Sequence, residues 1–474
     1  MANGPLRRTK IVCTLGPASE SPEVIRAMIR EGMDVARLNF SHGTWDWHER
    51  AAGLVREAAE GLGGEVAILQ DLPGPKIRVG EIRGGWVELK AGQDYTLTAE
   101  PLLGDGRAAS IGYEGFAEGL KEGDRIFLAD GVLELRVVGV EGRAVHCKVV
   151  VGGRLASRKG VNLPSKALRA PALTERDEEH LRFGLGLGVD MVALSFVRDP
   201  SDLRRAKRLI AEQGSEARVV AKIESQEALD NFDPILEEAD GIMIARGDLG
   251  IEIPFERVPM IQKGLISKAR RAGKPIITAT QMLGSMAENP RPSRAEAADV
   301  ANAILDGTDA LMLSEETASG KYPIESVRTM AKIAGAVEES FPFHSDAPGE
   351  RGAEGDVPTA IASAACQLAA MLDAFAIVAP TETGYTARQV SRHRPKQPII
   401  ALSPNPSTVR ALKLSWGVFP RRIPRLADTD GMLKSALESA ISWGAAKGDV
   451  VVAIAGHPVG MPHRTNLIRV YTVE

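Results

Sequence analysis

Eight short apolar runs alternate with helical patterns across the first two thirds of the chain, and this alternation constrains the fold more than any other feature. The runs are rich in Val, Ile and Leu, as is typical of strands buried on both faces of a sheet. Strands that alternate with helices form parallel sheets, and eight such units predict an α/β fold in the form of a closed (β/α)8 barrel. The runs are residues 11–15, 35–39, 66–70, 191–196, 219–223, 241–245, 275–280 and 310–314.

The alternation stops between residues 73 and 170, where short β-prone runs are separated by Gly, Asp and Glu turns. This stretch predicts a small all-β domain, in the form of a small β-barrel, inserted into the larger barrel after its third strand. Hinged at residues 73–75 and 161–171, the insert could close over the barrel as a lid that excludes water. A passive insertion is the alternative.

A third domain follows a Gly- and acid-rich linker at residues 345–358. Its apolar runs again alternate with helical patterns, which predicts an open α/β sheet. The predicted boundaries are 1–72 and 171–345 for the two parts of the barrel, 73–170 for the insert and 346–474 for the C-terminal domain.

Charge and cysteine content exclude several function classes. The formal net charge is -4 with both signs interspersed, which argues against nucleic acid as a partner. The three cysteines are far apart, so neither a disulfide framework nor a CxxC metal site is indicated. We read no secretory signal in residues 1–10 and no membrane span in the apolar stretch 361–380, and we expect an intracellular protein.

Polar side chains follow nearly every predicted barrel strand. Because the active site of such a barrel lies at the carboxyl ends of its strands, we expect these side chains to surround one site. A single Ser or Thr among them could equally be a helix cap. The residues are Arg37, Asn39, Ser41, Asp71, Ser195, Lys222, Glu224, Asp248, Thr280, Ser314 and Glu316.

Residues 219–250 contain the most informative part of this set. Lys222 and Glu224 share one face of their strand, and Asp248 follows the next strand along the chain, so the three side chains can converge. One ammonium beside two carboxylates leaves excess negative charge, which a divalent cation such as Mg2+ would offset. The glycines at 247 and 250 would let backbone amides approach an anion. A plain salt bridge at the end of the sheet remains the alternative.

Residues 381–386 in the C-terminal domain have three hydroxyl side chains and a glycine just before a predicted helix. Free amides at a helix N-terminus favour anions, so this loop is a plausible phosphate site. An ordinary capping turn is the alternative, and Glu382 would repel an anion.

Longer motifs carry a resemblance. VARLNFSHG at 35–43, DLPGPKIR at 71–78, KGVNLP at 159–164, AKIES at 221–225, ARGDLG at 245–250 and the long stretch 291–323 strongly resemble the pyruvate kinase family, of the bacterial type. The likeness covers essentially the whole chain. It implies transfer of the phosphoryl group of phosphoenolpyruvate to ADP, giving pyruvate and ATP, in the last step of glycolysis. It further implies a cytoplasmic homotetramer with a lid domain and an allosteric C-terminal domain.

The resemblance also implies roles for individual residues. Glu224 and Asp248 would hold Mg2+ or Mn2+. The residues implied in catalysis are Lys222, Thr280, Arg37, Ser314 and Glu316, the last two with Thr280 organising a water relay to the enolate. Those implied in substrate binding are Arg37, Lys222, Gly247, Asp248, Thr280 and Ser195. Nucleotide binding is implied for Arg78, Asn39, His42 and Lys159, and binding of a phosphorylated effector for Thr381, Thr383, Gly384 and Thr386.

The sequence departs from the family pattern near its monovalent-cation site. Many members hold K+ near the residues that match Asn39, Ser41, Asp71 and the backbone of Leu72, and have Glu where this chain has Lys76. A fixed ammonium could replace the ion, since two unit charges ~4 Å apart at an effective dielectric constant near 20 interact by about 4 kcal/mol. We therefore predict activity without K+. Lys76 as a solvated hinge residue is the alternative. Glu315 is a second departure, and the sequence offers no account of it.

Two other function classes remain open from the residues alone. A barrel enzyme of the aldolase or lyase type that acts on pyruvate enolates would also need Mg2+ and a basic residue, but no nucleotide. A metabolite sensor without catalysis is disfavoured, because Lys222, Glu224, Asp248, Arg37 and Thr280 are all present.

Overall fold

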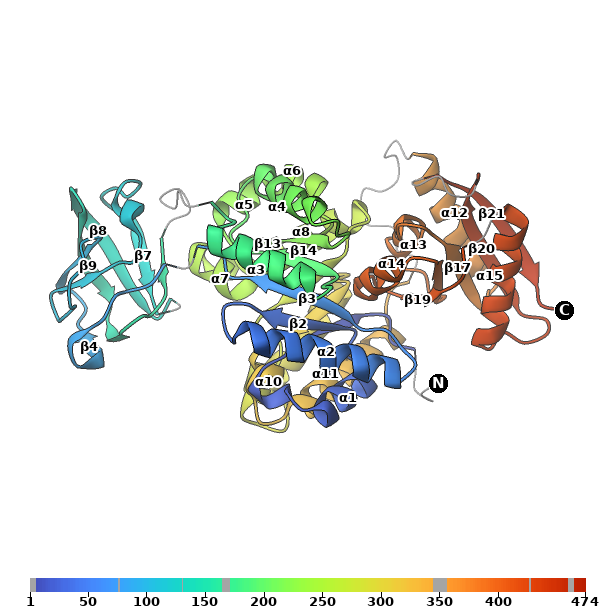
Figure 1. The fold of residues 1–474 in the computed structure, drawn as a ribbon, viewed down its shortest axis with the longest axis horizontal. Helices are drawn as coiled ribbons and strands as arrows, with labels where there is room; N and C mark the ends of the chain where they lie inside the picture. Colours follow the sequence, from blue (N-terminus) through green and yellow to red (C-terminus); the bar gives the residue numbers. More distant parts are fainter. Residues whose placement is uncertain are drawn as a thin grey trace.

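A closed barrel of eight parallel strands lies at the centre of the computed structural model (Figure 1), which describes residues 6–75, 77–129, 131–163, 171–343, 356–425, 428–458 and 464–474. The first strand, β1, pairs with both β2 and β16, which closes the sheet. The barrel fold is thereby confirmed. Its strands are β1 (Lys10–Thr14), β2 (Val35–Asn39), β3 (Ala67–Leu72), β12 (Met191–Leu194), β13 (Arg218–Ile223), β14 (Gly241–Ala245), β15 (Ile276–Ala279) and β16 (Ala310–Leu313).

Helices cover the outside of the barrel, and their starts follow local capping rules. Thr174 and Ser293, for example, each accept a hydrogen bond from the backbone amide three residues on. None of the helices in the described ranges is both long and apolar enough to span a bilayer. The helices are α1 (Pro22–Glu31), α2 (Trp45–Gly61), α3 (Glu175–Gly186), α4 (Pro200–Glu212), α5 (Gln226–Asp230), α6 (Phe232–Glu238), α7 (Arg246–Glu252), α8 (Val258–Arg271), α9 (Arg294–Leu305), α10 (Glu315–Ala318) and α11 (Pro323–Glu339).

The stretch between β3 and α3 is all-β, as predicted, and lies to one side of the barrel in Figure 1. It has a six-stranded sheet in the order β11-β7-β8-β9-β5-β6 and a two-stranded sheet of β10 and β4, and one apolar core fills it. Phe196, which follows β12 of the barrel, packs against that core. The strands are β4 (Trp86–Leu89), β5 (Asp94–Thr98), β6 (Ala108–Ser110), β7 (Arg125–Leu128), β8 (Leu133–Glu141), β9 (Ala144–Val151), β10 (Gly153–Ala156) and β11 (Val161–Asn162).

The C-terminal residues form an open α/β sheet in the order β19-β18-β17-β20-β21, with only β21 antiparallel to its neighbour. Strand β19 was not among the predicted runs, because its sequence VFPRR contains a proline and two arginines. The elements are α12 (Val357–Met371), β17 (Ala376–Pro380), α13 (Tyr385–Ser391), β18 (Ile399–Ser403), α14 (Pro406–Ala411), β19 (Val418–Arg422), α15 (Thr429–Trp443), β20 (Val450–Gly456) and β21 (Thr465–Thr472). Most of the predicted linker lies outside the described residues.

The C-terminal domain closes the end of the barrel where the strands begin. Leu414 joins the apolar cluster inside the barrel, and the backbone N–H of the fully buried Trp416 donates to Asp309 at 3.0 Å. Arg410 forms a 2.6 Å ion pair with Asp190, which immediately precedes β12. The opposite end, where the strands finish, is therefore the end that remains for a functional site.

Candidate active site

Lys222 lies at the centre of the polar cluster at the carboxyl ends of the barrel strands. Its Nζ is 2.6 Å from Ser195 Oγ, 2.7 Å from Glu224 Oε1 and 3.3 Å from Asp71 Oδ1. Burial by itself lowers the pKa of Lys222, but the nearby carboxylates, Asp71 first, outweigh burial and hold the pKa above its usual value. The ammonium is therefore permanently charged at neutral pH.

Asp71 connects this lysine to Arg37. The Arg37 Nε lies 2.7 Å from Asp71 Oδ2, and a second guanidinium nitrogen donates to Thr14 Oγ1 at 2.8 Å. Burial raises the pKa of Asp71, but the nearby cations Lys222 and Arg37 lower it by a larger amount, so the pKa lies below its usual range. Both oxygens of this buried carboxylate are thus occupied by cations, and two positive groups from different strands are held side by side.

Glu224 is positioned by the turn that follows β12. The backbone N–H of Phe196 donates to Glu224 Oε2 at 2.8 Å, and Phe196 has a φ of 55°, in the left-handed region that side chains rarely adopt. Burial raises the pKa of Glu224, Lys222 lowers it and Asp248 raises it again, with a net rise. Part of the charge on Glu224 is therefore still uncompensated.

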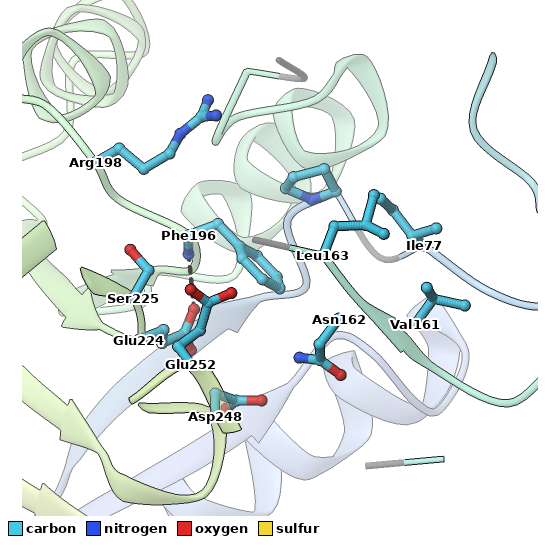
Figure 2. Close-up of a pocket in the computed structure, with 11 residues that line it drawn as sticks. Ile77, Val161, Asn162, Leu163, Phe196, Arg198, Glu224, Ser225, Asp248 and Glu252 are labelled. Atoms are coloured by element: carbon cyan, nitrogen blue, oxygen red, sulfur yellow. Dashed lines mark hydrogen bonds between the residues drawn. The ribbon is translucent and has the colours of Figure 1, made fainter. Parts of the chain in front are cut away.

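Glu224 and Asp248 line a hollow together with Glu252 and residues of the insert, including Asn162 and Leu163 (Figure 2). In the part of the chain that the structure describes, no group of three His, Cys, Asp or Glu side chains is arranged as a ready-made metal site. Mg2+ needs only one or two protein carboxylates and takes its other ligands from substrate and water. The Glu224 and Asp248 pair, with its excess negative charge, fits that requirement.

Sequence reasoning missed Glu252. It lies four residues after Asp248 on α7, and residues four apart share one face of a helix. That spacing was the signal that could have placed Glu252 in the same hollow.

The loops after β14 and β15 bring Gly247 and Thr280 together. The Gly247 N–H donates to Thr280 Oγ1 at 2.8 Å, and Thr280 has a φ of 70°. Arg246 fixes this arrangement, since its guanidinium donates to the Thr280 carbonyl at 2.8 Å and pairs with Asp299 at 2.8 Å. Arg246 has no role that can be assigned from the sequence, because nothing local shows that an arginine at a strand end will bind the next loop.

Glu316 is almost fully buried, and both of its oxygens accept backbone hydrogen bonds. The donors are the amide of Leu283 at 3.0 Å and the amide of Ser314 at 2.7 Å. The carboxylate therefore ties the loop after β15 to the end of β16, next to Thr280.

The four residues linked with the nucleotide lie on two domains. Arg78 and Lys159 are exposed on neighbouring segments of the insert. The backbone of Arg78 pairs with that of Gly160 in an isolated antiparallel β-bridge. Asn39 and His42 lie at and after the end of β2 in the barrel. A molecule that touched all four would span the opening between the insert and the barrel.

The residues of the expected K+ site already have polar partners within the protein. The Leu72 carbonyl accepts a 2.7 Å hydrogen bond from Ser195 Oγ, and Asn39 Oδ1 accepts one of 3.1 Å from the Ser41 amide. Asp71, as described above, already has two cationic partners. Lys76, the expected substitute for the ion, lies outside the described residues.

The expected effector residues surround the start of α13. Gly384 precedes this helix with a φ of 82°, and Thr381 follows β17. Thr386 is buried, and its hydroxyl shares a 2.8 Å hydrogen bond with Thr465, so its hydroxyl faces the domain interior. Thr381 and Thr383 remain half-buried.

Comparison with known proteins identifies the family. The model described as "Pyruvate kinase, barrel domain" matches residues 6–327, and "Pyruvate kinase, alpha/beta domain" matches residues 359–471. The chain belongs to the pyruvate kinase family. As an enzyme it is accordingly of the pyruvate kinase class, and the barrel, insert and C-terminal sheet agree with that membership.

Several pyruvate kinases are similar to the chain over its whole length. "Pyruvate kinase 2" of Synechocystis is 49% identical over 480 residues, which cover 100% of this chain and 81% of that protein. A pyruvate kinase of Clostridium acetobutylicum is 44% identical over 473 residues, 99% of this chain and 100% of the relative. The crystal structure of a pyruvate kinase from Cryptosporidium parvum superposes with a TM-score of 0.92 at 38% identity, covering 99% of this chain and 96% of that one.

Asp71→Asn tests the charge network of the site. Because the folded-state pKa of Asp71 is depressed, its carboxylate stabilises the fold above its unfolded pKa of about 3.9, and this stabilisation is lost as the pH falls through the folded pKa. We expect Asp71→Asn to unfold several degrees below the wild type at pH 7, with the difference shrinking below pH ~4, as measured by thermal unfolding between pH 7 and pH 3. Exposed Asp373→Asn is the control, and a difference that stayed constant with pH would contradict the assignment.

Proposed function

We propose that the chain transfers the phosphoryl group of phosphoenolpyruvate to ADP, giving pyruvate and ATP. The observation that carries this proposal is the fixed pair of cations, Lys222 and Arg37, held by Asp71 beside the carboxylates Glu224 and Asp248. A metaphosphate-like group that moves between two anions needs positive charge and in-line positioning rather than a protein nucleophile. The site supplies the positive charge, and full-length similarity to pyruvate kinases supports the same reaction.

Each side chain has a distinct task in this proposal. Lys222 faces the transferring phosphoryl group and the enolate oxygen that it leaves, while Arg37 binds phosphoryl oxygens. Ser195 holds the Lys222 ammonium in place at 2.6 Å. Glu224 and Asp248 would hold a divalent ion, Mg2+ or Mn2+, which would supply positive charge to stabilise the anionic reactants. The amides of Gly247 and Asp248, with the Thr280 hydroxyl, bind the substrate carboxylate.

Protonation of the enolate is assigned to water positioned by Thr280 and Ser314. Glu316 acts at one remove, since both of its oxygens are bound to backbone amides of the two loops that carry these hydroxyls. Its buried position fixes the loops rather than presenting a proton to the substrate.

The insert is proposed to act as a lid over the nucleotide. Arg78 and Lys159 on the insert and Asn39 and His42 on the barrel flank the opening where ADP would bridge the two domains. Closure would exclude water from the phosphoryl group and so suppress its hydrolysis. We propose that the barrel consists of residues 1–72 and 171–345. The insert would then be residues 73–170, and the C-terminal domain residues 346–474.

We also propose activity without K+, and the charges around Asp71 support this proposal. Its two oxygens are already paired with Lys222 and Arg37, which leaves little negative charge at the expected ion position. Lys76 would add a fixed ammonium nearby. The site residues Asn39, Ser41 and Leu72 then serve as neutral packing around the cationic pair.

A coupled pyruvate assay tests the reaction and its ion dependence together. With phosphoenolpyruvate, ADP and Mg2+ in a tetramethylammonium buffer, we expect full turnover that rises less than about twofold on adding KCl. Lys222→Met should lower kcat/KM by about 10²- to 10³-fold, since one preorganised charge stabiliser contributes about that much. Many-fold activation by KCl would overturn the ion proposal alone. Pyruvate formed without ADP, or none at all, would overturn the reaction in favour of an enolate lyase or a sensor.

Glu224→Gln tests the divalent-ion site. The raised pKa of Glu224 means that its ionised form is disfavoured in the fold, and this cost is present at any pH above its unfolded pKa. We therefore expect metal-free Glu224→Gln to unfold at a higher temperature than the wild type at pH 7, with no further rise on adding Mg2+. The exposed Glu212→Gln is the control. A Mg2+-dependent rise equal to that of the wild type would place the ion elsewhere.

Regulation is proposed to act through the loop of Thr381, Thr383, Gly384 and Thr386, with a phosphorylated small molecule as effector. The amides at the start of α13 and the hydroxyls of Thr381 and Thr383 would bind the phosphate, while Thr386 supports the loop through Thr465.

We further propose a homotetramer, as the family resemblance implies. Because phosphoenolpyruvate and ADP are cytoplasmic metabolites, the proposed reaction places the enzyme in the cytoplasm.

Thr381→Glu tests the effector loop. A carboxylate in the loop should repel a phosphate, so we expect loss of activation by phosphorylated sugars or nucleotides, with basal kcat within about twofold of the wild type. The readout is the phosphoenolpyruvate concentration at half-maximal rate, with and without the effector. Thr381→Ser is the matched control, and activation that survives in Thr381→Glu would move the effector site to another place.

A further inference from the structure

Phe196 lies where the barrel meets the insert. Its neighbours in the chain belong to the barrel, since Ser195 is 2% exposed and Val197 is fully buried in the core between the strands and the outer helices. The ring of Phe196 instead packs against the apolar core of the insert. In Figure 2 it points toward Leu163 of that core, on the wall of the hollow that Glu224 also lines. A side chain from the barrel rim thus contacts the domain that would act as a lid.

The backbone of Phe196 holds a carboxylate of the candidate active site. Its N–H donates to Glu224 Oε2 at 2.8 Å, while Glu224 Oε1 lies 2.7 Å from Lys222 Nζ. With one partner on each oxygen, the plane of the carboxylate is fixed. Each carboxylate oxygen has two lone pairs, so both oxygens can still approach a metal ion. The Phe196 N–H therefore orients a group that would hold the divalent ion.

The ring and the N–H of Phe196 are linked by a strained torsion. Its φ is 55°, in the left-handed region, which a residue with a side chain keeps only where its surroundings hold it there. Rotation about φ turns the side chain relative to the N–H. The contact with the insert and the contact with Glu224 therefore cannot change independently of each other.

The first hinge of the insert passes directly against this ring. Gly74 has a φ of 66°, and a Cβ at this position would lie 2.8 Å from Phe196 Cδ2, so a side chain there would collide with the ring. Ser195 Oγ donates to the carbonyl of Leu72, two residues before Gly74, and accepts from Lys222 Nζ. The turn at residues 195–196 thus contacts the hinge on one side and the charged groups of the site on the other.

We propose that Phe196 is a positioning residue that couples the insert to the divalent-ion site. With the insert against the barrel, its core holds the ring, and the N–H keeps Glu224 in the orientation that binds the ion. When the insert moves away, the ring is released, φ relaxes and the ion is bound more weakly. The inference rests on the proposed function, in which Glu224 is an ion ligand and the insert is a lid.

Coupling of this kind is reciprocal. If closure of the insert strengthens ion binding by some factor, the ion must favour closure by the same factor. The ion would then be held firmly only in the closed site, from which water is excluded during phosphoryl transfer.

The test measures ion affinity and insert position in the same full-length protein. Mn2+ affinity is read from the electron paramagnetic resonance signal of the free ion. The position of the insert is followed by energy transfer between labels on Glu141→Cys, exposed on the insert, and Glu212→Cys, exposed on α4. The native cysteines are buried and stay unlabelled.

Phe196→Ala removes the ring and keeps the N–H. We expect it to weaken Mn2+ binding about tenfold, as the loss of an outer contact to a metal ligand does, and to abolish the change in energy transfer that Mn2+ causes in the wild type. Phe196→Leu, which retains an apolar contact with the insert, should keep most of both responses.

Tyr113→Ala is the matched control, because Tyr113 packs against the same core from within the insert. With each variant shown to be folded by circular dichroism, Tyr113→Ala should keep both responses. Loss of neither response, or of only one, in Phe196→Ala would overturn the inference, since reciprocity requires that both change. Equal losses in Tyr113→Ala would also overturn it, because they would come from a weakened insert. A wild type whose energy transfer does not respond to Mn2+ would do the same.

Glu224→Gln in the same titration separates this inference from the proposed function. If Glu224→Gln binds Mn2+ as tightly as the wild type, the proposed ion site itself is wrong. If Glu224→Gln loses binding while Phe196→Ala behaves as the wild type, the ion site stands and only the coupling through Phe196 is wrong.

Discussion

The ion network around Lys222 is the interaction on which the rest of the site depends. An ammonium removed from water is costly, and it remains charged because Asp71 and Glu224 lie beside it. Asp71 in turn holds Arg37, so that two cations stay within one pocket despite their mutual repulsion. Removal of the Asp71 carboxylate would deprive two buried cations of their shared partner, which explains why three different strands must end at the same place.

The closed barrel supplies that convergence. Parallel strands end at the same rim, and the helices outside bring the chain back to the other end each time, so that Asp71, Lys222 and Asp248 reach one rim from distant parts of the sequence. The insert and the C-terminal domain then occupy opposite ends of the barrel. The insert adjoins the rim that carries the polar cluster, while the C-terminal domain is anchored at the other end by Leu414, which packs inside the barrel.

Most of the barrel could be predicted from the sequence because its strands are buried on both faces and read as continuous apolar runs. The same reasoning failed for β19, whose arginines and proline lie in an ordered strand only because β18 supplies its hydrogen bonds. For the site, Lys222, Glu224 and Asp248 could be predicted from strand-end positions. Glu252 could have been predicted from its spacing of four residues from Asp248 on α7, but Arg246 could not, since its importance arises from its contact with Thr280, which is on the loop after another strand.

The sequence by itself determined the order of the domains, the barrel and the family, because hydrophobic period and long motifs are local properties of the chain. Tertiary structure alone decided which charges became partners. It satisfied Asp71 with two cations, turned Glu316 toward two backbone amides, and buried Arg388 near enough to Arg218 that its pKa is lowered. The interaction energy of two charged groups depends on the distance between them and on their burial. Both are fixed only when segments far apart in sequence pack together.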